Sequence, residues 1–271
     1  MKYIIYSPPY NESVGGVVAL HLLSETLSSL GEDVYITGPT KRYSNKSKII
    51  SENDRFDLNK TIVVYPEVIV GNPFNAKHVV RWLLNTPRLM GGDGIFKDTD
   101  LIYKYVDYFK ADDESKVRGI LNVFDFKFEK FYDYGKDRTK KQCFMVKKGV
   151  GKKMIHEPDA IDFLPFLDDD NSRDIFNDCE MFISYDYASI HSIQAALCGC
   201  VSVVIPNENV DRDEFISKRP YFKYGIAYGM DDIERAKETM PMMRDYLKQL
   251  QEDSLQSVKD FVYQTKEHLN K

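Results

Sequence analysis

The sequence has little of what marks secreted or membrane-spanning proteins. Its 271 residues contain one tryptophan and no apolar run near the ~20 residues that a membrane-spanning helix needs. The short start MKYIIYSPPY does not resemble a signal peptide. The few cysteines lie in or beside apolar runs and lack the paired spacing of a metal site: Cys143, Cys179, Cys198 and Cys200. We therefore expect reduced core thiols in a cytoplasmic protein.

An overall excess of positive charge is also missing. The formal net charge of −5 argues against a generic nucleic-acid binder. The charge is unevenly distributed, however, because the segment 127–153 contains ten Lys or Arg and three acidic residues, a local charge of +7. At 43% hydrophobic and 29% charged residues, the composition is that of a globular chain with one large or two small domains.

The stretch 181–206 organises the chain. It reads as a strand at 181–183, a polar loop, a short helix capped by Ser189, and a second strand at 201–205 that Pro206 ends. So compact a strand–helix–strand unit implies parallel strands joined by a right-handed crossover. The loop before the helix then lies at the carboxyl end of a strand, where α/β sheets bind ligands. Its polar residues are Ser184, Tyr185, Asp186 and Ser189.

The N-terminal segment has the same pattern. A strand at 3–6 is followed by a loop at 8–16, a helix that ends at Gly31, and a strand at 34–37. The pair Gly15-Gly16 at the helix start would let a ligand approach backbone N–H groups and the positive end of the helix dipole. A tight turn explains the two glycines equally well.

Further strands are expected in both halves of the chain, at 62–65, 79–84, 101–105, 121–123, 143–146 and 224–229, and 231–271 reads as largely helical. Glu67 follows one of these strands, so it is a candidate for acceptor contact or for general-base catalysis. A solvated loop acid is the alternative. The aromatic and basic segment 124–141 reads as an interdomain linker whose rings pack, with base stacking as the alternative.

A lysine-rich, glycine-containing loop follows the strand at 143–146. Lys147 or Lys148 would suit a diphosphate there, although a solvated basic loop is the simpler explanation. The short acidic runs 98–100 and 168–170 match an Asp-x-Asp metal pattern, but neither directly follows a convincing strand. We expect both to be solvated loops and predict no metal site.

The run Gln194-Ala195-Ala196-Leu197-Cys198-Gly199, with Asp186 before it, resembles the donor-binding segment of GT-B glycosyltransferases. The similarity is to the retaining branch, which has two glutamates separated by seven residues. Asp186 and Gln194 have that separation, but Asp and Gln replace the glutamates. The resemblance implies an α/β fold of two Rossmann-like domains with parallel sheets and an interdomain cleft. We expect an acceptor domain at 1–125 and a nucleotide-sugar domain at 126–271, whose last helix crosses back onto the first.

The function that the resemblance implies is transfer of a hexosyl or pentosyl unit from a nucleotide-diphosphate donor to an acceptor hydroxyl, with retention and without a metal or cofactor. Asp186 and Glu67 are the expected catalytic residues. The expected donor-binding residues are Gly15, Gly16, Lys147, Lys148, Tyr185, Ser189, Ile190 and Gln194. A cell-surface glycan or similar molecule is the first acceptor candidate. A hydroxymethylated DNA base, as in phage enzymes, and a catalytically inactive nucleotide-sugar-binding homologue are the alternatives.

Overall fold

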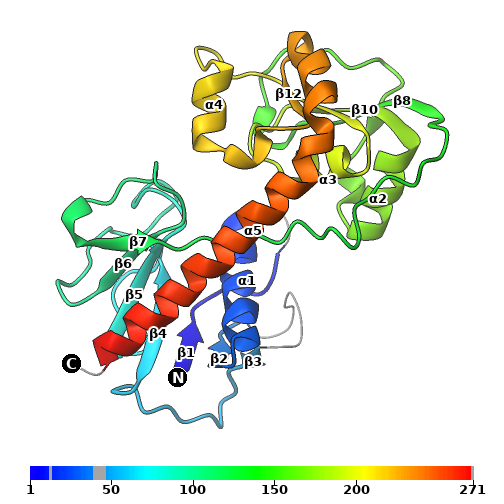
Figure 1. Ribbon diagram of the computed structural model, residues 1–271. Coiled ribbons are helices and arrows are strands. Elements are labelled where there is room, and N and C mark those ends of the chain that lie inside the picture. The colour runs from blue at the N-terminus through cyan, green and yellow to red at the C-terminus, as the bar shows by residue number, and fades with distance from the viewer. Residues whose placement is uncertain (12–13, 39–46, 270–271) are drawn as a thin grey trace. The chain divides into compact units, whose positions relative to one another are not determined.

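The computed structural model describes residues 1–11, 14–38 and 47–269. The chain forms two compact units, one of Met1–Asp125 with Gln251–Lys271 and one of Phe126–Leu250. The last helix, α5 (Ile233–Leu269), runs from the second unit into the first as one continuous helix (Figure 1). Both units are α/β structures built on a parallel sheet, as Rossmann-like domains are.

The sheet of the first unit has seven parallel strands in the order β3-β2-β1-β4-β5-β6-β7. The first six follow the strand order of dinucleotide-binding folds, which reverses between β1 and β4. The strands are β1 (Lys2–Ile5), β2 (Asp33–Ile36), β3 (Lys48–Ile49), β4 (Thr61–Pro66), β5 (His78–Leu83), β6 (Leu101–Lys104) and β7 (Val117–Ile120). All six residues of β4 and of β5 are buried, as expected for central strands covered on both faces.

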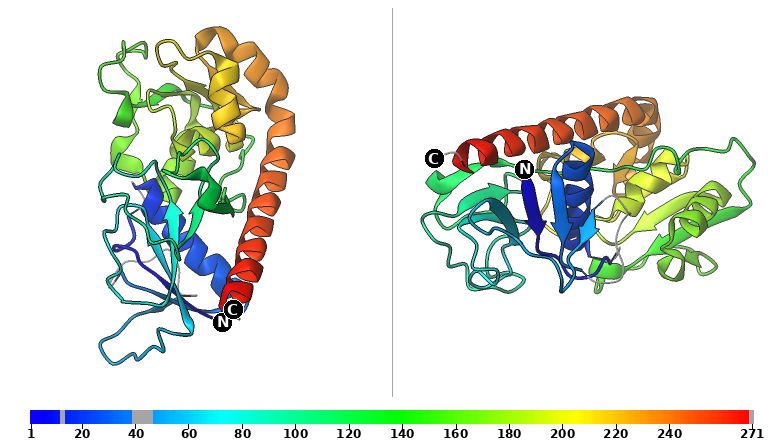
Figure 2. Two further views of the ribbon diagram at one scale, coloured as in Figure 1. Left: turned by 90° about the vertical axis from the view of Figure 1, so that its left-hand side faces the viewer. Right: turned by 90° about the horizontal axis from the view of Figure 1, so that it is seen from below.

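One face of this sheet is covered by helices. Alternate strand residues such as Tyr3 and Ile62 share a core with α1 (Gly15–Ser29) and with the C-terminal part of α5 (Figure 2). The Tyr3 hydroxyl also hydrogen-bonds Thr265 of α5 at 2.7 Å. The last helix is therefore part of the core of the first unit.

Loops cover the opposite face. Between β3 and β7 the chain contains no α-helix, and side chains from the loops pack on the intervening strand residues instead. Tyr65 and Val63 of β4 lie in this second core, against partly buried Phe56 and Phe74. The aromatic-rich loops thus cover this face of the sheet, which helices cover in a regular doubly wound fold.

The expected strand at 121–123 is wrong, because the seventh strand precedes it at Val117–Ile120. The Leu121 amide still donates to the Lys104 carbonyl of β6 at 2.8 Å, but beyond it the backbone of this segment bonds side chains. The Leu121 carbonyl accepts from the Trp82 indole at 2.8 Å, and the Val123 carbonyl accepts from the Tyr105 hydroxyl at 3.0 Å. An apolar run alone does not distinguish these two environments.

The second unit contains five parallel strands in the order β12-β11-β10-β8-β9. In chain order this is the 2-1-3-4-5 arrangement of flavodoxin-like sheets, which reverses between β8 and β10. The strands are β8 (Lys140–Met145), β9 (Ile161–Asp162), β10 (Cys179–Ser184), β11 (Val201–Val204) and β12 (Ile226–Tyr228). The helices α2 (Asp169–Asp178), α3 (Ile190–Leu197) and α4 (Arg212–Lys218) lie between successive strands from β9 onward.

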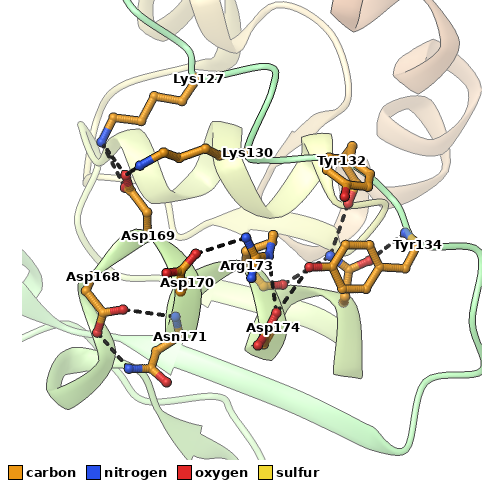
Figure 3. A network of polar contacts seen from close by, with 11 residues as sticks. Lys127, Lys130, Tyr132, Tyr134, Asp168, Asp169, Asp170, Asn171, Arg173 and Asp174 are labelled. Carbon is orange, nitrogen blue, oxygen red and sulfur yellow. Dashed lines mark hydrogen bonds and ion pairs between the residues drawn. The ribbon is translucent and has the colours of Figure 1, made fainter.

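The segment 126–139 is fastened to α2, as Figure 3 shows in part. Asn177 accepts from the Tyr134 amide at 2.8 Å and donates to the Tyr132 carbonyl at 3.1 Å. Arg138 donates to carbonyls at the C-terminal ends of both α2 and α3. Phe126 and Phe131 are buried, as expected, whereas Tyr132 and Tyr134 are exposed.

No helix in the described part of the chain is both long enough and apolar enough to cross a membrane. Although α5 has 37 residues, charged side chains recur along its whole length.

Candidate functional site

The candidate site of the second unit lies where its strand order reverses. The strands β8 and β10 are direct neighbours, and the register pairs Met145 with Ser184 at their carboxyl ends. In α/β sheets such a reversal of strand order is where ligands bind, at the carboxyl ends of the strands. Here the two following loops are in contact, because Gly149 packs against Tyr185. The loop after β8 carries the lysines, and the loop after β10 carries Asp186 and the start of α3.

Local hydrogen bonds fix Asp186 in the loop after β10. One carboxylate oxygen accepts from the Ala188 amide at 3.1 Å, and the Ser184 hydroxyl donates to the Asp186 carbonyl at 2.7 Å. Ser189 caps α3 as expected, because its hydroxyl accepts from the His191 amide at 3.3 Å. The carboxylate is therefore held close to the positive end of a helix.

Tyr185 and Ile190 occupy opposite environments. The Tyr185 side chain is fully buried, and its hydroxyl accepts from the Ile155 amide at 2.7 Å and bonds the His156 ring at 2.9 Å. It has no exposed surface with which to touch a donor, and instead supports the loop after β8, where Gly149 packs too closely against it to carry a Cβ. Ile190 is 41% exposed at the start of α3, unlike the buried Ile193 on the same expected helix face.

Gln194 has a partner inside the protein. Its side-chain oxygen lies 2.8 Å from Nδ1 of His191, one turn earlier on α3, and both residues are buried. Burial lowers the pKa of His191 to about 4, and the charge of Lys147 acts in the same direction. His191 is therefore neutral at pH 7, and no ligand is needed to satisfy the Gln194 oxygen.

The structure distinguishes between the two expected lysines. Lys147 opens the short turn η2 (Lys147–Gly149), is partly buried, and lies close enough to α3 for its charge to affect His191. Lys148 is exposed. Electrostatic proximity to the helix that carries Gln194 thus favours Lys147.

Sequence reasoning missed Lys152 as a site residue. Its ammonium group donates to the Ile205 carbonyl just after β11 at 2.6 Å, and burial lowers its pKa while the nearby charge of Asp186 opposes this. Lys152 therefore bridges from the loop after β8 to the carboxyl end of β11. Its place in the same lysine-rich run was the available signal, but the sequence does not show which lysine of the run folds inward.

A second candidate site lies at the strand-order reversal of the first unit, between β1 and β4. The helix α1 begins at Gly15 and Gly16, and its N-cap residue, Val14, has no polar side chain to cap it. The His21 ring lies 3.3 Å from the Pro8 carbonyl and supports the loop after β1. Part of the expected loop, residues 12–13, lies outside the described residues.

Glu67 follows β4 at this second site and is 3% exposed, so the expectation of a solvated loop acid as its alternative is wrong. Its carboxylate accepts from the Leu84 amide at 2.9 Å. Burial raises the pKa of Glu67, and hydrogen bonds from backbone N–H groups partly offset this. A buried carboxyl with a raised pKa is a recurrent feature of acid–base sites.

The acidic runs are only in part the solvated loops that we expected, since Asp98 and Asp170 are exposed but other acids of the two runs have structural partners. Asp168 caps α2 by accepting from the Asn171 amide at 3.0 Å, and Asp169 pairs with Lys127 and Lys130 at 2.8 and 2.6 Å (Figure 3). In the other run, Asp100 is buried in an ion pair with Arg81 at 2.9 Å. Within the described residues, no group of three or more His, Cys, Asp or Glu side chains could hold a metal ion.

No known protein family and no curated protein matches this chain. Among solved structures, the chain is similar to a functionally uncharacterized protein from Klebsiella pneumoniae. That similarity has a TM-score of 0.40 at 10% sequence identity and covers 82% of this chain and 90% of the other. Similarity at this level carries no functional argument.

Proposed function

We propose that this protein is a GT-B glycosyltransferase that moves a sugar from a nucleotide-diphosphate donor to an acceptor hydroxyl. The supporting observation is the composition of the loops at the carboxyl ends of β8 and β10. The N-terminus of α3, the carboxylate of Asp186 and the ammonium groups of Lys147 and Lys152 belong to the loops that follow these neighbouring strands. A helix N-terminus and two lysines suit a diphosphate, and a carboxylate suits sugar hydroxyls.

In this proposal the lysines stabilise the leaving group. The bond between the anomeric carbon and the diphosphate oxygen breaks, so negative charge develops on that oxygen. Lys147 and Lys152 would lie near it, in the role that a divalent ion has in GT-A enzymes. Lys152 already donates one hydrogen bond to Ile205 and has further N–H donors for a phosphate oxygen.

The remaining steps of the proposed reaction concern the sugar and the acceptor. Asp186 would bind the transferred sugar, and Gln194 would contact the ribose through its amide nitrogen. The acceptor oxygen forms the new bond to the anomeric carbon and loses its proton, for which Glu67 is the candidate base. This assignment requires that the two units enclose one cleft, as in GT-B enzymes, and retention of configuration follows from the family pattern alone.

An inactive, nucleotide-sugar-binding homologue is the second candidate. It is favoured by the hydrogen bond between Gln194 and His191, because the side chain that replaces a family glutamate is already satisfied. The DNA-modifying alternative is less favoured. Of the ten basic residues at 127–153, Lys127 and Lys130 pair with Asp169 and Arg138 caps helices, so this part of the positive charge is engaged within the protein.

A thermal-shift and calorimetry panel of nucleoside diphosphates and nucleotide sugars tests the proposal. Binding at 100 times Kd should stabilise the protein by about 2.7 kcal/mol. The double variant Lys147→Gln/Lys152→Gln should bind at least about tenfold more weakly, since it loses two charge-assisted contacts. The matched control is Lys148→Gln/Lys153→Gln, which removes the same charge from exposed positions.

The proposal is wrong if no nucleotide stabilises the protein, or if the Lys147/Lys152 double variant binds like the control. Binding of a nucleotide sugar without turnover over any acceptor tested would favour the inactive homologue.

A further inference from the structure

A cavity of about 410 Å³ lies within the first unit, between the loops that follow β4 and β5. Its volume lies in the range of small-molecule sites, ~300–1,000 Å³. The lining includes Val70, Asn75, Asp93, Ile95, Phe96 and Lys97, with Arg81 of β5 among them. All of these residues lie in the first unit, and no sequence motif marked them as a site.

A buried arginine holds both walls of this cavity in place. The Arg81 side chain is 3% exposed and donates to Asp100 of the β5–β6 connection at 2.9 Å. It also donates to the carbonyls of Ile69 and Gly71 in the β4–β5 loop. A buried ion pair is weak evidence for stability, because desolvation of the two charges offsets their attraction. Its position here suits a role in shaping the cavity.

The β4–β5 wall is braced a second time by Asn72. Its side-chain oxygen accepts from the Tyr65 hydroxyl at 2.9 Å and from the Ala76 amide at 3.1 Å, and its amide nitrogen donates to the Ala76 carbonyl at 2.8 Å. On the other wall, Asp93 accepts from the Ile95 amide at 2.9 Å. The cavity is thus preorganised, which reduces the entropy cost of binding a ligand.

The polar groups left over can both donate and accept. In the described part of the chain, neither the side-chain amide of Asn75 nor the Lys97 ammonium group makes a hydrogen bond or an ion pair. Asp93 keeps a second carboxylate oxygen beyond the one that binds Ile95. The charge of Arg81 is paired with Asp100, and Lys97 and Asp93 have opposite charges, so the lining has no unpaired net charge.

The apolar part of the lining is exposed. Val70 and Ile95 are 58% and 73% exposed, and the ring of Phe96 is partly buried against the Arg81 guanidinium at 5.2 Å. Exposed aliphatic side chains beside an aromatic ring provide a surface for the C–H groups of a ligand.

We propose that this cavity binds a neutral sugar ring, the terminal saccharide unit of the acceptor. A sugar presents C–H groups on its faces and hydroxyls that donate and accept at its edge, which matches the combination of Phe96 and Ile95 with Asn75, Asp93 and Lys97. A phosphate would meet the Asp93 carboxylate, so an anionic ligand fits less well. That the bound saccharide is the acceptor rests on the proposed transferase function, whereas saccharide binding in this cavity does not.

Saturation-transfer difference NMR with the full chain tests this assignment, using methyl α- and β-glycosides of glucose, galactose, mannose, rhamnose and N-acetylglucosamine as probes. At least one glycoside should bind. Phe96→Leu and Asn75→Gly should each weaken it by about tenfold, equivalent to 1.4 kcal/mol. Glycine tolerates the left-handed conformation of Asn75, φ 51°, so this variant should fold.

The matched controls are Phe56→Leu and Asn59→Gly, which make the same changes outside the cavity lining and should leave glycoside affinity unchanged. Melting temperatures of all four variants separate lost binding from lost folding. The proposal fails if none of the glycosides binds, or if affinity is unchanged in the folded Phe96 and Asn75 variants. A short DNA duplex that binds here instead of the glycosides also overturns it.

Nucleotide binding, measured on the same samples, separates this proposal from the transferase. Nucleotides that bind while no glycoside does would refute the cavity assignment alone. Glycosides that bind in the absence of any nucleotide affinity would refute the transferase and leave a saccharide site.

Discussion

Replacing Gln194 distinguishes a ligand-binding side chain from a structural one. Gln194→Ala removes the partner of His191 Nδ1, a contact of 2.8 Å in a buried environment. Leaving a buried polar group unsatisfied costs about 1–3 kcal/mol. For a chain of this size each kcal/mol lowers the melting temperature by roughly 2–4 °C, so a decrease of roughly 2–12 °C is expected.

The second consequence depends on the donor. If the side-chain nitrogen of Gln194 contacts the ribose, Gln194→Ala should raise the Kd of nucleotide and nucleotide sugar alike by about tenfold. This is the effect of losing one hydrogen bond worth about 1.4 kcal/mol. A purely structural side chain would change the melting temperature and leave both Kd values at their original level.

Gln194→Glu adds a charge without changing the length of the side chain. A carboxylate beside His191 favours the imidazolium form, so the pKa of His191 should rise from about 4 in this variant. Each unit of pKa regained is worth about 1.4 kcal/mol at a pH below both values. Relative to the native protein, the variant should therefore gain stability as the pH falls from 7 to 5, and its nucleotide affinity should be retained.

Calorimetric Kd values and melting temperatures of the native protein and the two variants, at pH 7.5 and 5.5, provide the test. Gln142→Ala, a change of the same kind on β8, is the control for stability without ligand contact. The reasoning is refuted if Gln194→Ala leaves nucleotide Kd unchanged. The His191 pairing is refuted if Gln194→Glu shows no pH-dependent gain over the native protein.

Three further outcomes are expected. Asp186→Ala should lower kcat/KM by about one to two orders of magnitude without unfolding the protein, because it removes a charge-assisted contact worth ~1.5–3 kcal/mol; an unchanged rate would exclude Asp186 from the reaction. Turnover should survive EDTA, because the lysines supply the positive charge; loss in EDTA with rescue by Mn²⁺ would return the acidic runs to consideration. Protonation of His191 in the unfolded state should contribute a loss of about 3 kcal/mol of stability between pH 6.5 and pH 4. The folded-state pKa of His191, about 4, lies below its unfolded value, so the unfolded state binds the proton first as the pH falls. His191→Phe should be less pH-sensitive in chemical denaturation over this interval, and an equal slope in both proteins would contradict the assignment.

The sequence predicted the elements whose signals are local. Apolar runs located β1, β4, β5, β10 and β11 within a residue or two, and Ser189 caps α3 as its position predicts. Period and capping depend on neighbours a few residues apart, so they can be read without knowing the fold. The compact strand–helix–strand around α3 also implied parallel pairing, which the register of β10 with β11 confirms.

Where a segment's partners are distant in sequence, the prediction was wrong or missing. The run at 121–123 is apolar like a strand, yet its carbonyls accept hydrogen bonds from the side chains of Trp82 and Tyr105. The acids at 168–170 read as a loop, but they form the start of α2. Asp168 is the N-cap of this helix, and Asp169 forms ion pairs with two distant lysines. Composition does not indicate which distant group will satisfy a backbone or a charge.

The candidate site divides in the same way. A polar loop with Asp186 before α3 and a lysine-rich loop after an earlier strand could be predicted from local patterns. Other features are visible only in the folded chain: these strands are neighbours, Lys152 turns inward to Ile205, and Tyr185 and Gln194 are buried with partners of their own. Strand order and burial come from contacts between residues far apart in the chain. These contacts form only when the sheet is assembled, so the free energy that they contribute cannot be predicted from a single stretch of sequence.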